Sequence, residues 1–245
     1  MHFFILSNVL ISGTVLLFQV GCFASIDEKL LAVHFEYPGP AISERDLPIC
    51  TSYAVCSVLH KRFWMSPIVQ RLCRCLRVEC PYEWSDYPEN KTMHLDNRSQ
   101  LKFCDDVSEL SECGQNKLAL TVAITTTELE STPVSPTPTV EEERKLSVNV
   151  SCFCPSAFAW EEQPQKQVIQ NPENGTIIVT QYMCKPMQKC SSSEFCGNIR
   201  ADYFSTYYRC SCPIGHMCLN KNRTMIKGNE LLYEGQVYQA FCYPQ

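Results

Sequence analysis

Apolar residues are concentrated at the start of the chain. They run from Phe3 to Phe18, no Asp, Glu, Lys or Arg occurs among the first 24 residues, and small residues stand third-last and last in Cys22-Phe23-Ala24. This pattern predicts a signal peptide over residues 1–24 that is cleaved after Ala24. Polar residues interrupt the run too often for a membrane span of about 20 apolar residues. We therefore expect a mature protein that is secreted, extracellular and not inserted in a membrane.

Beyond this segment, the apolar and polar positions predict short strands joined by tight turns. Asn174-Gly175 is a favoured hairpin turn because both residues accept positive φ, and β-branched residues lie on each side of it, at 168–169 and 177–179. Asp96-Asn97 and Glu234-Gly235 likewise precede strand-like runs that end in a cysteine. These patterns predict β-hairpins.

The intervals between the cysteines repeat. Near the start they are Cys50-x5-Cys56-x16-Cys73-x-Cys75-x4-Cys80-x23-Cys104, and at the end they are Cys190-x5-Cys196-x13-Cys210-x-Cys212-x5-Cys218-x23-Cys242. The cysteines between these runs match the first, third, fourth and sixth places and are Cys113, Cys152, Cys154 and Cys184. Such a repeat predicts three related units and not one irregular domain.

The repeat predicts a small disulfide-rich, mostly β fold of three related cysteine modules with six, four and six cysteines. Of the 17 cysteines, Cys22 leaves with the expected signal peptide, so 16 remain for disulfides. This high proportion of cysteine favours several small disulfide-linked units over one large core. After the signal peptide, the expected parts are an N-terminal extension and modules 1, 2 and 3, at residues 25–49, 50–112, 113–189 and 190–245.

The missing cysteines of module 2 indicate a pairing. Its second and fifth places are both empty, whereas the loss of only one partner would leave a free thiol. We infer that these places pair, which joins Cys56 to Cys80 and Cys196 to Cys218. A bond within Cys-x-Cys is sterically poor. The remaining cysteines then pair first to third with fourth to sixth, or first to fourth with third to sixth, and the sequence leaves both arrangements open.

Thr, Ser, Pro and Glu are abundant in residues 121–145, inside module 2. A stretch of this composition buries too little apolar surface to order itself, so we expect a disordered, flexible Thr/Pro-rich insertion. It could act as a spacer, with or without O-linked glycans, that lets the neighbouring modules reorient. We favour an exposed loop without a role, since loop length costs little stability.

Five Asn-x-Ser/Thr sequons predict a glycoprotein, at Asn90, Asn97, Asn149, Asn174 and Asn222. In a secreted chain we expect exposed sequons to carry glycans, which mark faces that are open to solvent. Asn174 also lies in the predicted tight turn, which disfavours its modification.

Charge and the reactive side chains exclude several functions. The net charge of −5 is spread along the chain, whereas a nucleic-acid-binding protein needs a strongly basic face. The four histidines of the mature chain lie in no motif that sets a nucleophile beside a base. The cysteine pattern assigns every sulfur to a disulfide, and zinc sites prefer Cys-x2-Cys pairs in a reducing compartment. We predict no catalytic residue, no cofactor and no metal.

One stretch of module 1 mixes cations with large aromatic side chains. Since Trp, Tyr and Arg dominate binding energy at protein interfaces, it gives a candidate binding face of Lys61, Arg62, Trp64, Arg71 and Arg74. Alternatively, Phe63 and Trp64 are the small core of the module. Module 3 has an equally aromatic stretch at 203–209, so we favour the core interpretation.

The residues around the cysteines carry a resemblance to known proteins. They include Cys50-Thr-Ser-Tyr-Ala-Val-Cys56, Cys73-Arg-Cys75, Cys152-Phe-Cys154-Pro, Tyr182-Met-Cys184-Lys-Pro and Tyr208-Arg-Cys-Ser-Cys212-Pro. From about Cys50 to Cys242, this frame resembles the scoloptoxin(11) family of centipede venom toxins. It is also similar to giant-lens, the insect antagonist of epidermal growth factor receptor signalling whose three related β domains clamp the growth factor.

The resemblance implies two functions. The first is a secreted venom toxin that binds a membrane receptor or ion channel, with block of voltage-gated potassium channels as its specific version. The second is a secreted antagonist that sequesters an epidermal-growth-factor-like ligand. A secreted enzyme has no residues to support it. The insertion and the sequons are more than a compact channel blocker needs, and the oligomeric state stays open.

Overall fold

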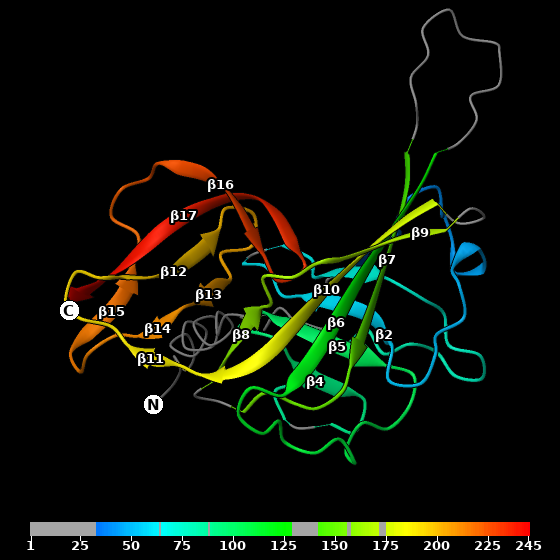
Figure 1. Cartoon of the computed structure of the whole chain (residues 1–245), viewed down its shortest axis with the longest axis horizontal. Coiled ribbons are helices and arrows are strands. Elements are labelled where there is room, and N and C mark those ends of the chain that lie inside the picture. The colour runs from blue at the N-terminus through cyan, green and yellow to red at the C-terminus, as the bar shows by residue number, and fades with distance from the viewer. Residues whose placement is uncertain (1–32, 64, 88, 129–141, 156–157, 172–174) are drawn as a thin grey trace, which may run out of the picture. The chain divides into compact units, whose positions relative to one another are not determined.

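Strands make up almost all of the regular structure. The computed structural model describes residues 33–245 except 64, 88, 129–141, 156–157 and 172–174, so the expected signal peptide lies outside the described residues. The described part holds seventeen strands and one short 3-10 helix, Glu44–Asp46, but no α-helix (Figure 1). Within it, no helix has the length and apolar character to cross a membrane. The mostly β, disulfide-rich fold that the sequence predicts is confirmed.

Module 1 forms a five-stranded sheet in the order β1-β3-β2-β5-β4. Its strands are β1 (His34–Glu36), β2 (Val55–His60), β3 (Ile68–Arg71), β4 (Thr92–His94) and β5 (Ser99–Phe103). β1 pairs with β3, so part of the N-terminal extension belongs to this sheet. Asp96-Asn97 lies in the β4–β5 turn, as predicted, where the Leu95 N–H donates to the Ser99 carbonyl (2.9 Å).

The central strands of this sheet are covered on both faces. Every residue of β2 and β5 is buried, including the polar ones. The segment between β3 and β4 supplies partners for them: Ser57 Oγ donates to the Pro81 carbonyl (3.3 Å), and the Ser85 N–H donates to Gln100 Oε1 (3.1 Å). These hydrogen bonds offset the cost of removing the polar groups from water.

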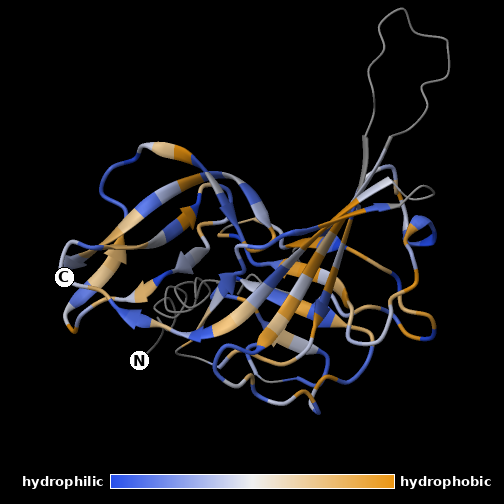
Figure 2. Ribbon diagram, viewed as in Figure 1, coloured by the Kyte–Doolittle hydropathy of each residue, from blue (hydrophilic) through white to orange (hydrophobic). Residues whose placement is uncertain are grey.

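Module 2 has longer strands, in the order β7-β6-β10-β8, with β9 also paired to β10. They are β6 (Leu118–Glu128), β7 (Glu142–Val150), β8 (Phe158–Glu162), β9 (Gln167–Asn171) and β10 (Gly175–Pro186). Figure 2 shows apolar residues along β6, β7 and β10. β9 and β10 are antiparallel, as predicted, while residues 172–174 between them, including the sequon residue Asn174, lie outside the described part.

The pairing of β6 with β7 corrects the borders of the expected insertion. Residues 121–128 and 142–145, which the composition assigns to a flexible stretch, are strand residues, and β6 pairs with β7 and β10 at once over 121–126. Thr counts toward disorder in an argument from composition, but β-branched Thr also favours strands. Residues 129–141 lie outside the described part.

Module 3 has the strand order β13-β12-β17-β15, with β16 also paired to β17. These strands are β12 (Phe195–Arg200), β13 (Thr206–Tyr208), β15 (His216–Leu219), β16 (Met225–Glu230) and β17 (Tyr233–Pro244). A separate short pair joins β11 (Gln188–Lys189) to β14 (Cys210–Ser211).

The hairpin turn predicted at Glu234-Gly235 is wrong. Glu230 pairs with Tyr233, and Gly235 lies inside β17 opposite Gly228, so the turn falls at 231–232. Leu232 adopts a positive φ of 59° there. Leu231 is buried in the core, and this burial outweighs the turn preference of Glu-Gly.

Eight disulfides follow the repeat. Modules 1 and 3 join the first to the third, the second to the fifth and the fourth to the sixth cysteine. Module 2 has the first-to-third and the fourth-to-sixth bonds. The bonds are Cys50–Cys73, Cys56–Cys80, Cys75–Cys104, Cys113–Cys152, Cys154–Cys184, Cys190–Cys210, Cys196–Cys218 and Cys212–Cys242. Of the two arrangements left open by the sequence, the structure has the first-to-third one, and Cys56 and Cys196 have the partners inferred from module 2.

The repeat in spacing is also a repeat in backbone geometry. The β2–β5 register shifts between Val55 and Ser57, and the β12–β17 register shifts between Phe195 and Gly197. A β-bulge of this kind adds one residue to a strand and increases its twist. In both modules the bulge therefore coincides with the second cysteine.

A shared aliphatic core joins the three modules. In Figure 1 the sheet of module 1 lies behind β6, β7 and β10. The core combines residues of all three modules: Val55, Val58, Leu72, Leu101, Phe103, Val107, Leu120, Val122, Val148, Val150, Tyr182 and Leu231. The cystines form smaller clusters inside each module. The expectation of small units without a large core is thus corrected: each disulfide lies within one module, but the three modules share one apolar core.

Candidate binding surface

The basic residues chosen from the sequence do not share one face. Lys61 and Arg62 follow β2, where Lys61 Nζ lies 5.5 Å from the Trp84 ring and Arg62 Nε donates to the Ser66 carbonyl (2.8 Å). Trp64 lies outside the described residues. Arg71 is only 3% exposed, which corrects its place in the candidate face.

Arg71 and Arg74 instead hold the N-terminal extension against module 1. The Arg71 guanidinium is bound through two nitrogens to the carboxylate of Glu44, at 2.5 Å each. The Arg74 N–H donates to the Pro48 carbonyl (2.8 Å), and the Cys50 N–H donates to the Arg74 carbonyl (3.0 Å). β3 is covered because it lies between β1 and β2.

The aromatic stretch of module 3 packs against module 1. The Tyr203 ring lies 4.9 Å from the His60 imidazole. Next to it, the buried Arg200 donates to both carboxylate oxygens of Asp202 (2.9 and 2.7 Å) and stacks on the rings of Tyr203 and Tyr233 (4.3 and 3.8 Å to the centroids). Such partners compensate the desolvation of a buried guanidinium. No sequence motif connects His60 with Tyr203, so sequence reasoning missed this contact.

Burial sets the protonation states at this contact. It lowers the pKa of His60 to about 3, with a further contribution from the charge of Arg200 and an opposing one from Asp202. It also raises the pKa of Tyr203 to about 12. Both rings are therefore uncharged near neutral pH, which suits a contact that excludes water.

Two aromatic side chains close in sequence to His60 and Tyr203 are half exposed, Phe63 at 50% and Phe204 at 51%. Phe63 lies against the Arg98 guanidinium (3.3 Å to the ring centroid), and the charge of Arg62 acts on the pKa of Tyr203. We call Arg62, Phe63, Tyr203 and Phe204 the junction surface. The interpretation of these aromatic stretches as module cores holds for Tyr207, which packs against the shared core, but not for the half-exposed Phe63 and Phe204; Trp64 lies outside the described residues.

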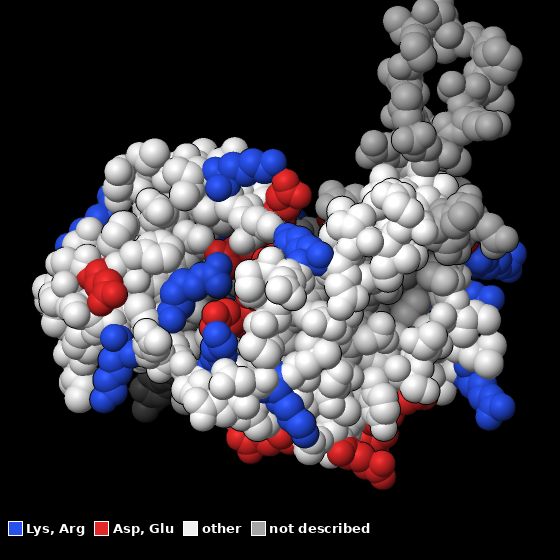
Figure 3. All heavy atoms as spheres, in the orientation of Figure 1, with Lys and Arg blue, Asp and Glu red and all other residues white. Residues whose placement is uncertain are grey.

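A cavity of about 160 Å³ lies where the three modules meet. Its lining includes Asp96 from module 1, Trp160 and Tyr182 from module 2, and Glu230 from module 3. Glu230 is buried, so its pKa is raised, and it accepts hydrogen bonds from Asn198 Nδ2 (2.6 Å) and Arg209 Nη2 (2.5 Å). Figure 3 shows basic and acidic side chains interspersed on the face in view.

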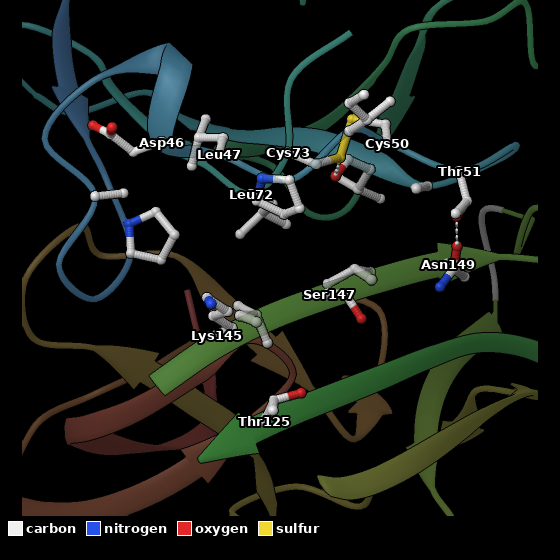
Figure 4. Close-up of a pocket in the computed structure, with 18 of the residues that line it drawn as sticks. Asp46, Leu47, Cys50, Thr51, Leu72, Cys73, Thr125, Lys145, Ser147 and Asn149 are labelled. Carbon is white, nitrogen blue, oxygen red and sulfur yellow. Dashed lines mark hydrogen bonds between the residues drawn. A yellow bond between two sulfur atoms is a disulfide. The ribbon is translucent and has the colours of Figure 1, made fainter. Parts of the chain in front are cut away.

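A larger cavity of about 600 Å³ lies between module 1 and β7 (Figure 4). We call it the intermodule groove. Leu47 of the N-terminal extension and Leu72 of module 1 lie on one side, while Lys145 and Ser147 of β7 lie on the other. At one end, Asn149 Oδ1 accepts a hydrogen bond from Thr51 Oγ1 (3.4 Å).

The described sequon residues differ in exposure. Asn90, Asn97 and Asn222 are exposed, whereas Asn149 is half-buried in β7. Asn90 Nδ2 donates to Asp106 Oδ2 (2.8 Å), and Thr224 Oγ1 donates to Asn222 Oδ1 (2.7 Å).

The close cysteine sulfurs do not form a metal site. Cys50, Cys75 and Cys104, for example, have sulfurs within 4.8 Å of one another. Each of these sulfurs is in a disulfide, and the thiolate is the form that binds metals. The exposed aromatic side chains on this cross-linked scaffold can instead supply the contacts of a protein interface.

Comparison with known proteins finds a distant relative. The chain is 24% identical over 217 residues to U-scoloptoxin(11)-Sm7a of Scolopendra morsitans, a match over 80% of this chain and 88% of the toxin. The chain is similar to a centipede toxin. Its fold is also similar to the crystal structure of unliganded Argos, a relative of giant-lens, with a TM-score of 0.50 and 23% identity over 88% of this chain and 99% of that one. No family model matches the chain. The resemblance inferred from the cysteine frame is thus confirmed at the level of scaffold.

Proposed function

We propose that this chain is a secreted antagonist that binds an epidermal-growth-factor-like ligand and keeps it from its receptor. The observation that carries the proposal is the fold likeness to Argos, which extends over 88% of this chain and 99% of that one and so includes all three modules. Eight disulfides fit an oxidising, extracellular environment. The cysteine frame is similar to that of giant-lens, which clamps such a growth factor.

The junction surface is our candidate for the contact with this ligand. Aromatic and Arg side chains contribute most of the binding energy at protein interfaces. Before binding, Arg98 packs on the Phe63 ring, and the backbone at Phe204 is fixed by a hydrogen bond from its N–H to the carbonyl of Arg200 (3.1 Å). Preorganisation of this kind lowers the entropy cost of association.

Biolayer interferometry with the mature protein and a panel of recombinant epidermal-growth-factor-like domains tests the proposal. We expect one or more domains to bind. F63A and F204A should each weaken that binding by about 30-fold, because removal of a central aromatic contact costs about 2 kcal/mol.

The matched control is Y87A, since Tyr87 is an aromatic residue of module 1 that is 79% exposed and lies outside the junction surface. We expect its affinity to equal that of the unchanged protein. If no domain binds, the proposed function is wrong. If F63A and F204A bind as tightly as Y87A does, the function stands but the contact lies elsewhere.

A venom toxin that acts on a membrane receptor or ion channel is the second candidate. The match to a centipede toxin over 80% of the chain favours it. Recordings of voltage-gated potassium currents in the presence of the natively folded protein test its specific version. Block that F63A or F204A weakens would support the toxin, and inactivity on a broad channel panel would contradict it.

A further inference from the structure

The intermodule groove has a mixed lining. Leu47, Leu72 and Val148 line it with apolar groups, and Thr125 and Ser147 line it with hydroxyl groups. β7 contributes both kinds, the buried Val148 and the neighbouring exposed Ser147. Its volume of about 600 Å³ is typical of pockets that hold small molecules, roughly 300–1,000 Å³. Such a groove suits a sugar ring, which has C–H faces and hydroxyl groups.

Asn149 stands at one end of this groove (Figure 4). It begins the sequon Asn149-Val150-Ser151. Thr51 Oγ1 engages its carboxamide oxygen (3.4 Å) and not its nitrogen, and the nitrogen is the atom to which an N-linked glycan attaches. The Val150 N–H donates to the Tyr53 carbonyl (3.2 Å), which fixes β7 against module 1 at this point. A glycan on Asn149 would therefore start at the mouth of the groove.

We propose that the intermodule groove holds the first sugar residues of an N-linked glycan on Asn149, which bind modules 1 and 2 together. In the transfer, Asn149 Nδ2 bonds to C1 of N-acetylglucosamine, the bond from C1 to the phosphate oxygen of a lipid-linked pyrophosphate donor breaks, and the amide nitrogen releases one proton as the lipid pyrophosphate departs. Since Asn149 is half-buried in the folded protein, the transfer precedes folding, and the module 1–module 2 contact closes around the sugar.

The other described sequons do not lie at the intermodule groove. Asn90 and Asn222 are exposed and do not line either cavity, so their glycans would extend into solvent. Asn97 is exposed at the smaller cavity of about 160 Å³. The inference rests on passage through the secretory pathway, as in the proposed function, but not on the identity of the ligand.

Variants of Ser151 test the inference in a secreting eukaryotic cell line. S151A removes the sequon but leaves Asn149 and its bond to Thr51 in place, and Ser151 is exposed. S151T keeps the sequon. T224A removes the sequon of the exposed Asn222 and is the matched control.

Mass spectrometry should find the glycan on Asn149 in the unchanged protein and in S151T, but not in S151A. A peptide N-glycosidase should release it from the native protein at least about tenfold more slowly than it releases the Asn222 glycan, since release needs local opening. After reduction and denaturation the two rates should be equal. Amide hydrogen exchange at 146–148 should rise by about tenfold in S151A and stay unchanged in T224A.

Two outcomes would overturn the inference. One is an unmodified Asn149 in a secreted protein that carries a glycan on Asn222, which would leave the proposed secretion intact. The other is equal release of both glycans from the native protein, because the Asn149 glycan would then point into solvent. A chain that is neither secreted nor glycosylated would contradict the proposed function as well.

Discussion

Several titratable side chains are buried, and each has a polar partner. His60 Nδ1 lies 3.0 Å from Ser99 Oγ, and Lys102 Nζ donates to Thr92 Oγ1 (2.9 Å). Burial lowers the pKa of Lys102 to about 8. The sequence places such residues on the surface by default, since Lys and His are rarely fully buried. They are buried here because β2 and β5, the strands that carry them, are covered on both faces.

The pKa of His60 makes the stability depend on pH. In the folded protein the pKa is about 3, against about 6.5 in an unfolded chain, so only the unfolded state takes up a proton between these values. The free energy of unfolding should therefore be unaffected by His60 above pH 6.5. It should fall by at most about 1.4 kcal/mol per pH unit as the pH decreases through this window. Chemical denaturation between pH 5.0 and 6.5 measures the slope.

The variant H60Q should have a smaller slope over the same range, because the side chain no longer titrates. H216Q, with the same substitution at a histidine outside the contact with Tyr203, should keep the full slope. Equal slopes in H60Q and the unchanged protein would show that His60 does not cause the pH dependence.

At the scale of elements, turn chemistry predicts some hairpins and fails for others. Asp96-Asn97 forms its turn, where Asp96 Oδ1 accepts a hydrogen bond from the Arg98 N–H (2.7 Å). Glu234-Gly235 does not, because burial of Leu231 moves the turn by three residues and places Gly235 opposite Gly228. Residues 121–128 form a strand because β6 finds partners on both sides, β7 and β10. These outcomes depend on long-range contacts, and local composition carries no information about them.

The bulge in β12 requires a glycine. Gly197 has a φ of 156°, and a Cβ there would lie 2.2 Å from the carbonyl oxygen of Tyr207. We expect G197A to lower the free energy of unfolding by at least about 2 kcal/mol, since the clash is with backbone and cannot relax cheaply. The control is G114A, where no atom lies within 4 Å of the added Cβ. Guanidinium denaturation of both variants checks this, and equal stabilities would contradict the role of the bulge.

At the scale of the whole molecule, the cysteine spacing predicts the modules but not how they join. Local intervals identify which cysteines are equivalent. The joining depends on Leu231, Tyr203 and Arg200, which have no distinguishing pattern in the sequence. The candidate binding face from the sequence is correspondingly divided, with Arg71 inside the protein and Arg62 acting on Tyr203 of another module. A surface that two modules form together cannot be predicted from the sequence of either module alone.

Leu231 should couple module 3 to the common core. L231A removes a buried side chain, so we expect it to lower the free energy of unfolding by about 2–5 kcal/mol. Hydrogen exchange should also rise at residues 95–97, which line the cavity of about 160 Å³ together with Leu231. I214A, at a fully exposed position, should stay within about 0.5 kcal/mol of the unchanged protein. Unchanged exchange at 95–97 in L231A would argue against coupling.

Nonreducing peptide mapping tests the disulfide framework. Trypsin cuts after Arg74, between Cys73 and Cys75, so the two bonds of that motif can be separated. We expect the tryptic peptide with Cys50 and Cys56 to be joined to those of Cys73 and Cys80, and the Cys75 peptide to be joined to that of Cys104. A second protease that cuts between the cysteines of one tryptic peptide should then resolve Cys56 to Cys80 and Cys196 to Cys218. A peptide that joins Cys50 to Cys75 would reject the first-to-third arrangement.

Each of the eight disulfides closes within one module, and this has a consequence for biosynthesis. Oxidation of module 1 can finish once Cys104 has entered the oxidising compartment, while module 3 is still being translated, since domains generally fold from the N-terminus during synthesis. Docking of module 3 must wait for Leu231, which is synthesised after all of modules 1 and 2. A slow ribosome therefore delays assembly of the core but does not leave early cysteines waiting for late partners, which protects the nascent chain from mispaired thiols.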